Sequence, residues 1–188
     1  MIASACLYVL IVIAAVTDFK YRKIYNAITY PGMLIALALN GLGELLERQA
    51  TVPEDQLRFV LGQIGFGESV LGLLACGIPM LFCYVIFGIG AGDVKMLAMI
   101  GAFLGVERGL EALLWTFVLA GCLGIIALTW SVGLGRALKR AAGQMLYFLK
   151  YRGWAELTPD ERALLDFPWY MAPTALAAVV LVQLDLAH

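Results

Sequence analysis

The sequence predicts an all-α polytopic membrane protein with six transmembrane helices. Of its 188 residues, 62% are apolar and only 14% are charged, whereas soluble domains are about 45–50% apolar and about 25% charged. The apolar residues gather in long runs, and a helix of about 20 of them spans roughly 30 Å of hydrocarbon. This composition excludes a disordered chain and a nucleic-acid-binding arm, so we expect no nucleic acid among the partners.

Six apolar runs predict the spans, at residues 2–17, 27–46, 69–87, 94–106, 110–132 and 169–186. The first run ends at Asp18, the second opens near Pro31, and the fourth is short. A chain of this length is expected to fold as one unit. We therefore expect a single six-helix membrane domain over residues 1–188.

The basic residues predict the orientation of these spans. One side carries Lys20, Arg22, Lys23 and Lys95, together with the basic residues of 133–168, whereas the other carries Arg48, Arg58 and Arg108. Cytoplasmic loops are enriched in Lys and Arg. The first side is therefore predicted to face the cytoplasm, and both termini are predicted to lie on the non-cytoplasmic side.

Two long loops join these spans. Residues 133–167 are predicted to be a cytoplasmic loop, and residues 136–152 within it mix apolar and basic side chains. That mixture is typical of an amphipathic helix lying in the interface on anionic lipid. A plain anchor and a substrate-guiding role both fit this helix. The loop of residues 47–68 is acidic and external, and its function stays open.

Few side chains in this sequence suit nucleophilic or metal chemistry. The four cysteines, Cys6, Cys76, Cys83 and Cys122, lie in apolar runs and form no C-x-x-C pair, and the one histidine is His188. Zinc-site spacing and a Ser-His triad are therefore not predicted. We expect no metal and no cofactor.

Two of the 14 acidic residues are distinguished by their position. Asp18 ends the first predicted span and Asp93 begins the fourth, both on the predicted cytoplasmic side. A 16-residue span is only about 24 Å long, so we expect both carboxyl groups to lie slightly inside the bilayer surface. Carboxylates at that depth indicate a functional site by default.

Asp93 follows a glycine-rich segment in which residues 88–95 read G-I-G-A-G-D-V-K. Glycines let the backbone turn tightly and approach a partner closely, although a flexible turn with Asp93 as an N-cap fits equally well. Lys95 points away from Asp93 on a regular helix, and we expect its ammonium to reach lipid headgroups.

Two carboxyl groups at one depth suggest aspartyl protease chemistry. Close carboxylates cannot easily both ionise. The ionised one can then draw a proton from water while the protonated one polarises the scissile carbonyl. This chemistry requires no metal and no covalent intermediate.

Residues 90–95, G-A-G-D-V-K, resemble the G-x-G-D-x-K motif of the type IV prepilin peptidases, which are six-span aspartic proteases of the inner membrane. The segment from Asp18 to Asn26 is similar to the family's first motif, with Tyr25 in place of the usual proline. Residues 101–105 and 167–173 also resemble family segments. The resemblance covers almost the whole chain.

This resemblance implies that Asp18 and Asp93 are the catalytic pair. Gly90 and Gly92 would form the supporting turn, with Lys95 and Asn26 as further motif positions. The implied substrate is a prepilin, cleaved after its basic leader at the cytoplasmic face of the inner membrane, without a cofactor. The chain lacks the two C-x-x-C pairs of the long bacterial members, so it resembles the short form that serves Flp (tight-adherence) pili, and methyltransferase activity is not expected.

Other functions stay open beside this one. An archaeal-type preflagellin or pseudopilin peptidase would share the same site. A small proton-coupled transporter is disfavoured because both acids lie at one face rather than near the midplane. A non-catalytic membrane subunit would leave the pairing of Asp18 with Asp93 unexplained. The sequence leaves the oligomeric state open.

Overall fold

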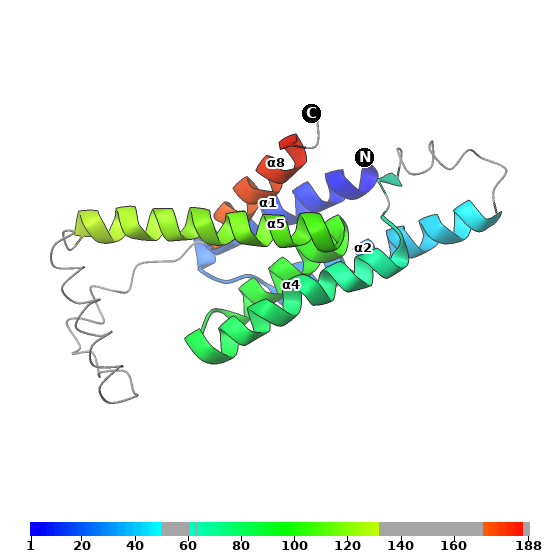
Figure 1. Cartoon of the computed structure of the whole chain (residues 1–188). Coiled ribbons are helices and arrows are strands. Elements are labelled where there is room, and N and C mark those ends of the chain that lie inside the picture. Colours follow the sequence, from blue (N-terminus) through cyan, green and yellow to red (C-terminus); the bar gives the residue numbers. More distant parts are fainter. Residues whose placement is uncertain (50–60, 63, 132–170, 186–188) are drawn as a thin grey trace. The chain divides into compact units, whose positions relative to one another are not determined.

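The computed structural model describes residues 1–49, 61–62, 64–131 and 171–185. The elements of these residues are α1 (Ile2–Tyr21), α2 (Asn26–Gln49), α4 (Phe66–Phe87), α5 (Ala91–Ser131) and α8 (Met171–Asp185), shown in Figure 1. The predicted all-helical fold is confirmed for this part of the chain. The predicted loop of residues 133–167 and its interfacial helix lie outside the described residues.

The backbone packs as two compact units. The first contains Met1–Phe117 and Tyr170–His188, and the second contains Val118–Trp169. In the first unit, α1 packs against both α8 and α2, and α2 also packs against α4. In the second unit, the described residues are the last turns of α5. Both aspartates singled out in the sequence lie in the first unit.

The helices have the length and composition of a multi-pass membrane protein. Within the described residues, four apolar segments are long enough to cross a membrane: Ile2–Tyr21, Asn26–Glu47, Phe66–Ile86 and Ala91–Ile126. The shorter apolar helix Met171–Leu184 lies where the sixth span was predicted. The predicted fourth and fifth spans, residues 94–106 and 110–132, both lie within α5 or reach its end.

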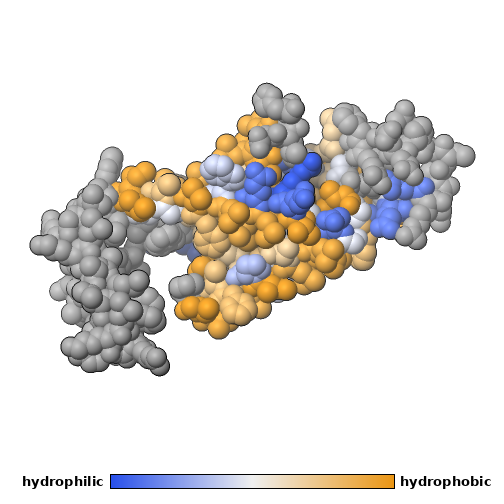
Figure 2. All heavy atoms as spheres, in the orientation of Figure 1, coloured by the Kyte–Doolittle hydropathy of each residue, from blue (hydrophilic) through white to orange (hydrophobic). Residues whose placement is uncertain are grey.

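Large apolar side chains remain exposed on these helices, as lipid contact requires. Phe82 is 66% exposed and Val85 is 74% exposed, and Figure 2 shows apolar side chains over much of the visible surface. The buried positions include many alanines, such as Ala14, Ala36 and Ala102. Small residues at helix contacts are typical of membrane proteins, where close van der Waals packing replaces the hydrophobic effect.

Helix α5 reverses direction at Gly105. This glycine has φ 80° and ψ −171°, which no helix accommodates. A Cβ placed on Gly109 would lie 3.0 Å from the Cα of Gly101, although residues eight apart in a straight helix are separated by about 12 Å. The chain therefore folds back at Gly105, as Figure 1 shows. Helix α5 thus consists of two arms, one before Gly105 and one after it.

The polar groups beside this reversal are satisfied by neighbouring helices. Carbonyls in the last turn before a helix break lack in-helix donors. The carbonyl of Ala102 accepts hydrogen bonds from Ser69 Oγ at 2.6 Å and from Asn40 Nδ2 at 3.4 Å. Asn40 Oδ1 in turn accepts the N–H of Ile64 at 3.1 Å. These hydrogen bonds join α2, α5 and residues 64–69 at this end of the first unit, and the two to Ala102 are buried.

Helices α4 and α5 cross with their backbones in contact. A Cβ on Gly72 would overlap the carbonyl oxygen of Gly101, and a Cβ on Gly101 would overlap that of Gly72. The Cβ on Gly101 would also lie 2.8 Å from the Sγ of Cys76. Both positions therefore require glycine, and this contact fixes how closely the first arm of α5 approaches α4.

Candidate active site

Asp18 lies in the last turn of α1 and is almost fully buried, with 8% of its surface exposed. The helix closes one turn later at Arg22, which adopts φ 51° and donates its N–H to the carbonyl of Asp18 at 2.8 Å. The carboxyl group of Asp18 therefore points into the protein within about one turn of the end of the helix.

The start of α8 reaches the Asp18 carboxyl group. The N–H of Ala172 donates to Asp18 Oδ2 at 3.3 Å. The first N–H groups of a helix have no acceptor within it, and α8 begins at Met171. Ala172 is itself fully buried, so Asp18 provides the acceptor that this N–H would otherwise lack.

Asp93 lies in the first turn of α5, after a tight connection from α4. Gly88 ends α4 with φ 68°, and the N–H of Asp93 donates to the carbonyl of Gly90 at 3.1 Å. A Cβ on Gly90 would lie 2.8 Å from Asp93 Oδ2. The glycine at position 90 therefore leaves the space that the Asp93 carboxyl group occupies.

Gly92 brings the connection between α1 and α2 onto the start of α5. A Cβ on Gly92 would lie 2.9 Å from the Cβ of Ile24 and 3.3 Å from its carbonyl oxygen. Ile24 follows Asp18 by only six residues, and Gly92 adjoins Asp93. These contacts pack the residues that follow Asp18 against those that adjoin Asp93. The fold thus brings together the ends of two helices that are far apart in the sequence.

Lys95 and Asn26, the two further motif positions, are in direct contact. Lys95 Nζ donates to Asn26 Oδ1 at 2.8 Å and lies 4.9 Å from the centroid of the Tyr30 ring. The sequence predicts that this ammonium reaches lipid headgroups, whereas the structure gives it two partners on α2.

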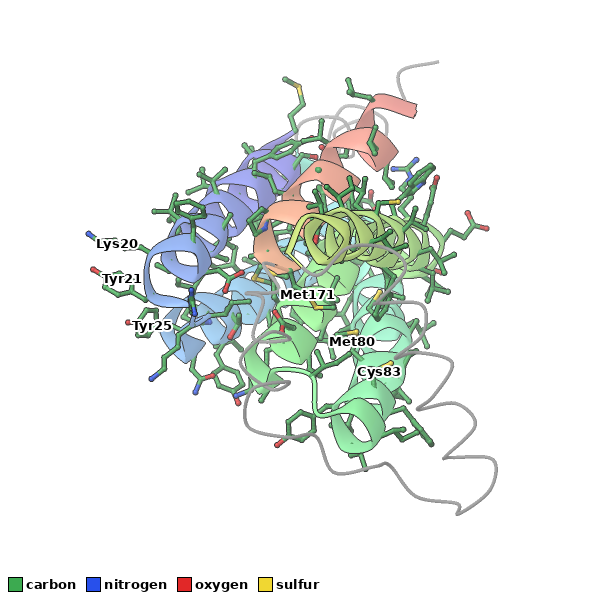
Figure 3. The ribbon with its side chains drawn as sticks, turned by 90° about the vertical axis from the view of Figure 1, so that its left-hand side faces the viewer. Lys20, Tyr21, Tyr25, Met80, Cys83 and Met171 are labelled. Atoms are coloured by element: carbon green, nitrogen blue, oxygen red, sulfur yellow. The ribbon has the colours of Figure 1, made fainter. Side chains whose placement is uncertain are left out.

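Further cations and tyrosines lie at the same end of the helices. Lys20 Nζ is 5.3 Å from the Tyr21 ring centroid, and the rings of Tyr21 and Tyr25 meet edge to face at 6.2 Å. Figure 3 shows these three side chains pointing away from the ribbon, whereas Met171 at the start of α8 lies inward. Basic and aromatic side chains of this kind are typical of a membrane–water interface.

Sequence reasoning missed some of the groups around the two aspartates. The N–H of Ala172 carries no side-chain signal, and only the likeness of residues 167–173 to a family segment pointed to this region. Elsewhere, in the first turn of α2, the sequence also did not single out Thr29, whose hydroxyl is buried and has no hydrogen-bond partner among the described residues. These same residues contain no cluster of three His, Cys, Asp or Glu side chains that could hold a metal ion.

One comparison with known proteins finds a match. A model of the type IV leader peptidase family matches residues 5–125, which is more than half of the chain. The match includes Asp18, Asp93 and the glycines before Asp93. No curated protein and no solved structure matches the chain.

Proposed function

Because the chain belongs to the type IV leader peptidase family, we propose that it is an aspartic endopeptidase that removes the basic leader of prepilins. The catalytic groups are Asp18 and Asp93. The observation that carries this proposal is the contact of Ile24 with Gly92, which brings the end of α1, with Asp18, next to the start of α5, with Asp93.

The reaction follows from two carboxyl groups that hold one proton between them. The ionised carboxylate takes a proton from a water molecule, whose oxygen attacks the scissile carbonyl carbon. The protonated carboxyl group gives its proton to the carbonyl oxygen. In the collapse of the tetrahedral intermediate, the carboxyl group that took the proton from water gives it to the amide nitrogen, and one hydroxyl returns its proton to the other carboxylate. The C–N bond breaks, the leader is released and the carboxyl pair again holds one proton.

The proposed topology has six spans, with the active site at the cytoplasmic face of the inner membrane. The reversal at Gly105 supports two spans within α5. Basic residues lie near both aspartates in the sequence: Lys20, Arg22 and Lys23 near Asp18, and Lys95 near Asp93. Cytoplasmic loops are enriched in such residues, which supports a cytoplasmic site. Both termini would then lie on the opposite side.

The proposed substrate is a Flp-type prepilin, whose apolar helix lies in the bilayer beside the enzyme. A leader junction at the membrane surface would then reach Asp18 and Asp93 without leaving the interface. We expect cleavage without methylation, because the four cysteines form no C-x-x-C pair. Preflagellins and pseudopilins are the alternative substrates of the same site.

The test is cleavage of a Flp-type prepilin by the purified protein in lipid vesicles. We expect Asp18→Ala and Asp93→Ala each to abolish leader removal while insertion and expression stay normal. Glu107→Gln is the matched control, since it removes an exposed carboxylate beside the Gly105 reversal. Normal cleavage by Asp93→Ala would overturn the proposal, and proton-coupled uptake without cleavage would indicate the transporter.

A further inference from the structure

One face of α5 follows α2 from its first turn to the Gly105 reversal. Contacts join the two segments at regular intervals: Gly92 with Ile24, Lys95 with Asn26, Met99 with Gly32, and Ala102 with Asn40. Positions three and four apart lie on the same face of a helix. The rotation of α5 about its own axis is therefore set along this face.

The side chain of Asp93 projects from a different face of α5 than the one that follows α2. On an α-helix it lies about 100° from Gly92 and about 200° from Lys95. A small rotation of α5 thus moves the Asp93 carboxyl group sideways without changing the position of the helix axis. Whatever fixes the rotation of the first turns of α5 also fixes the direction of this carboxyl group toward Asp18.

Lys95 provides the hydrogen bond at this end of the face. Its ammonium is held by the amide oxygen of Asn26, the first residue of α2, and by the ring face of Tyr30 one turn later. A hydrogen bond to a charged group is shorter and stronger than one between neutral groups. The neighbouring contact of Gly92 with Ile24 is a packing contact. The hydrogen bond of Lys95 depends on orientation as well as distance, so it restricts the rotation of this part of α5 more closely.

We propose that Lys95 is a positioning residue for the aspartate pair. By tying the start of α2 to the second turn of α5, it sets the rotation of α5 and hence the approach of Asp93 to Asp18. This inference rests on the proposed function. It differs from an anchoring role in lipid headgroups, because the partners of Lys95 are two side chains of α2.

The test measures kcat and KM separately for prepilin cleavage in vesicles. For Lys95→Met we expect kcat to fall about 10- to 100-fold, since a displacement of about 1 Å at a catalytic group has this effect, while KM changes less than about twofold. The matched control is Lys20→Met. Lys20 is an exposed cation over a tyrosine of its own helix, so this variant removes a similar group that joins no two helices, and its kcat should stay unchanged.

Conservative variants separate positioning from folding. Lys95→Arg and Asn26→Asp keep a donor and an acceptor at the two positions, and we expect both to retain most of the wild-type kcat. Asn26→Leu should lower kcat as Lys95→Met does, and combining these two substitutions should lower it little further. Strictly additive losses in this double variant would overturn the inference.

Other outcomes identify other roles for Lys95. A raised KM with unchanged kcat would show that Lys95 binds substrate. Unchanged kcat and KM for Lys95→Met would show that it acts as a headgroup anchor at most, and either result overturns the inference. Failure of the proposed function itself is distinct, because then either the wild-type protein would not cleave prepilin, or Asp18→Ala and Asp93→Ala would still cleave it.

Discussion

The backbone N–H of Ala172 donates a hydrogen bond to Asp18 Oδ2, joining residues that are 154 positions apart. The bond places the first turn of α8 against the last turn of α1, and these two helices pack against each other. α8 lies beyond the region matched by the family model, yet it supplies a group to the candidate site. The acceptor on Asp18 therefore has a structural role in addition to its proposed chemistry.

This contact predicts that two substitutions of Asp18 differ in stability although both abolish cleavage. Asp18→Asn keeps an oxygen that can accept the N–H of Ala172, whereas Asp18→Ala leaves this buried donor without a partner. We expect Asp18→Ala to be less stable than Asp18→Asn by about 1–3 kcal/mol. Denaturant unfolding in detergent micelles measures the difference, and equal midpoints for the two variants would contradict it.

Gly90→Ala is predicted to impair catalysis without removing any polar group. The added methyl group would lie 2.8 Å from Asp93 Oδ2 and would push the carboxyl group away from its position. We expect kcat to fall about 10- to 100-fold with little change in KM. Gly67→Ala is the control, because no atom lies within 4 Å of its Cβ. Wild-type kcat in Gly90→Ala would show that the carboxyl group tolerates the shift.

Gly72→Ala is predicted to destabilise the crossing of α4 with α5. The new Cβ would overlap the carbonyl oxygen of Gly101, a backbone atom that cannot move by rotating a side chain. Overpacking of this kind costs about 1–3 kcal/mol. Thermal unfolding in micelles should show a lower midpoint. By comparison, Gly121→Ala meets open space and should be neutral or stabilising by up to about 1 kcal/mol.

Asn40→Leu is predicted to destabilise the first unit at the Gly105 reversal. It removes the acceptor of the Ile64 N–H and one donor to the Ala102 carbonyl, at a cost of about 1–3 kcal/mol. The control is Thr116→Val, which removes a buried hydroxyl that bonds only within its own helix, to the carbonyl of Ala112. Unfolding midpoints compare the two, and an equal loss in both variants would argue against the network.

The individual elements could be predicted because they depend on local sequence. Apolar runs predicted the positions of α1, α2 and α4, since a helix satisfies the hydrogen bonds of its own backbone groups in a bilayer. The same reasoning singled out Asp18 and Asp93, because carboxylates at the ends of apolar spans are costly unless they have a function. The glycines at 90 and 92 were expected to permit a tight turn, and in the structure a Cβ at position 90 or 92 would lie 2.8 or 2.9 Å from a side-chain atom.

The partners of these residues could not be predicted in the same way. Lys95 was expected to reach lipid headgroups, because nothing in its own segment indicates that Asn26 and Tyr30 lie beside it. The reversal of α5 rests on the backbone angles of Gly105 together with Asn40 and Ser69, which come from two other helices. Such contacts depend on how the helices pack, which the hydropathy of a single segment does not predict.

The sequence by itself predicted a multi-pass membrane protein, the positions of α1, α2 and α4, and the two acidic residues of the proposed site, since hydropathy and helical spacing act over a few turns. Only the tertiary structure decided that α8 reaches Asp18, that Lys95 ties α5 to α2, and that Gly105 folds α5 back on itself. The physical reason is that these relationships join residues distant in the chain or depend on a single backbone conformation. Close packing of small residues, such as Gly72 against Gly101, selects one such arrangement among many.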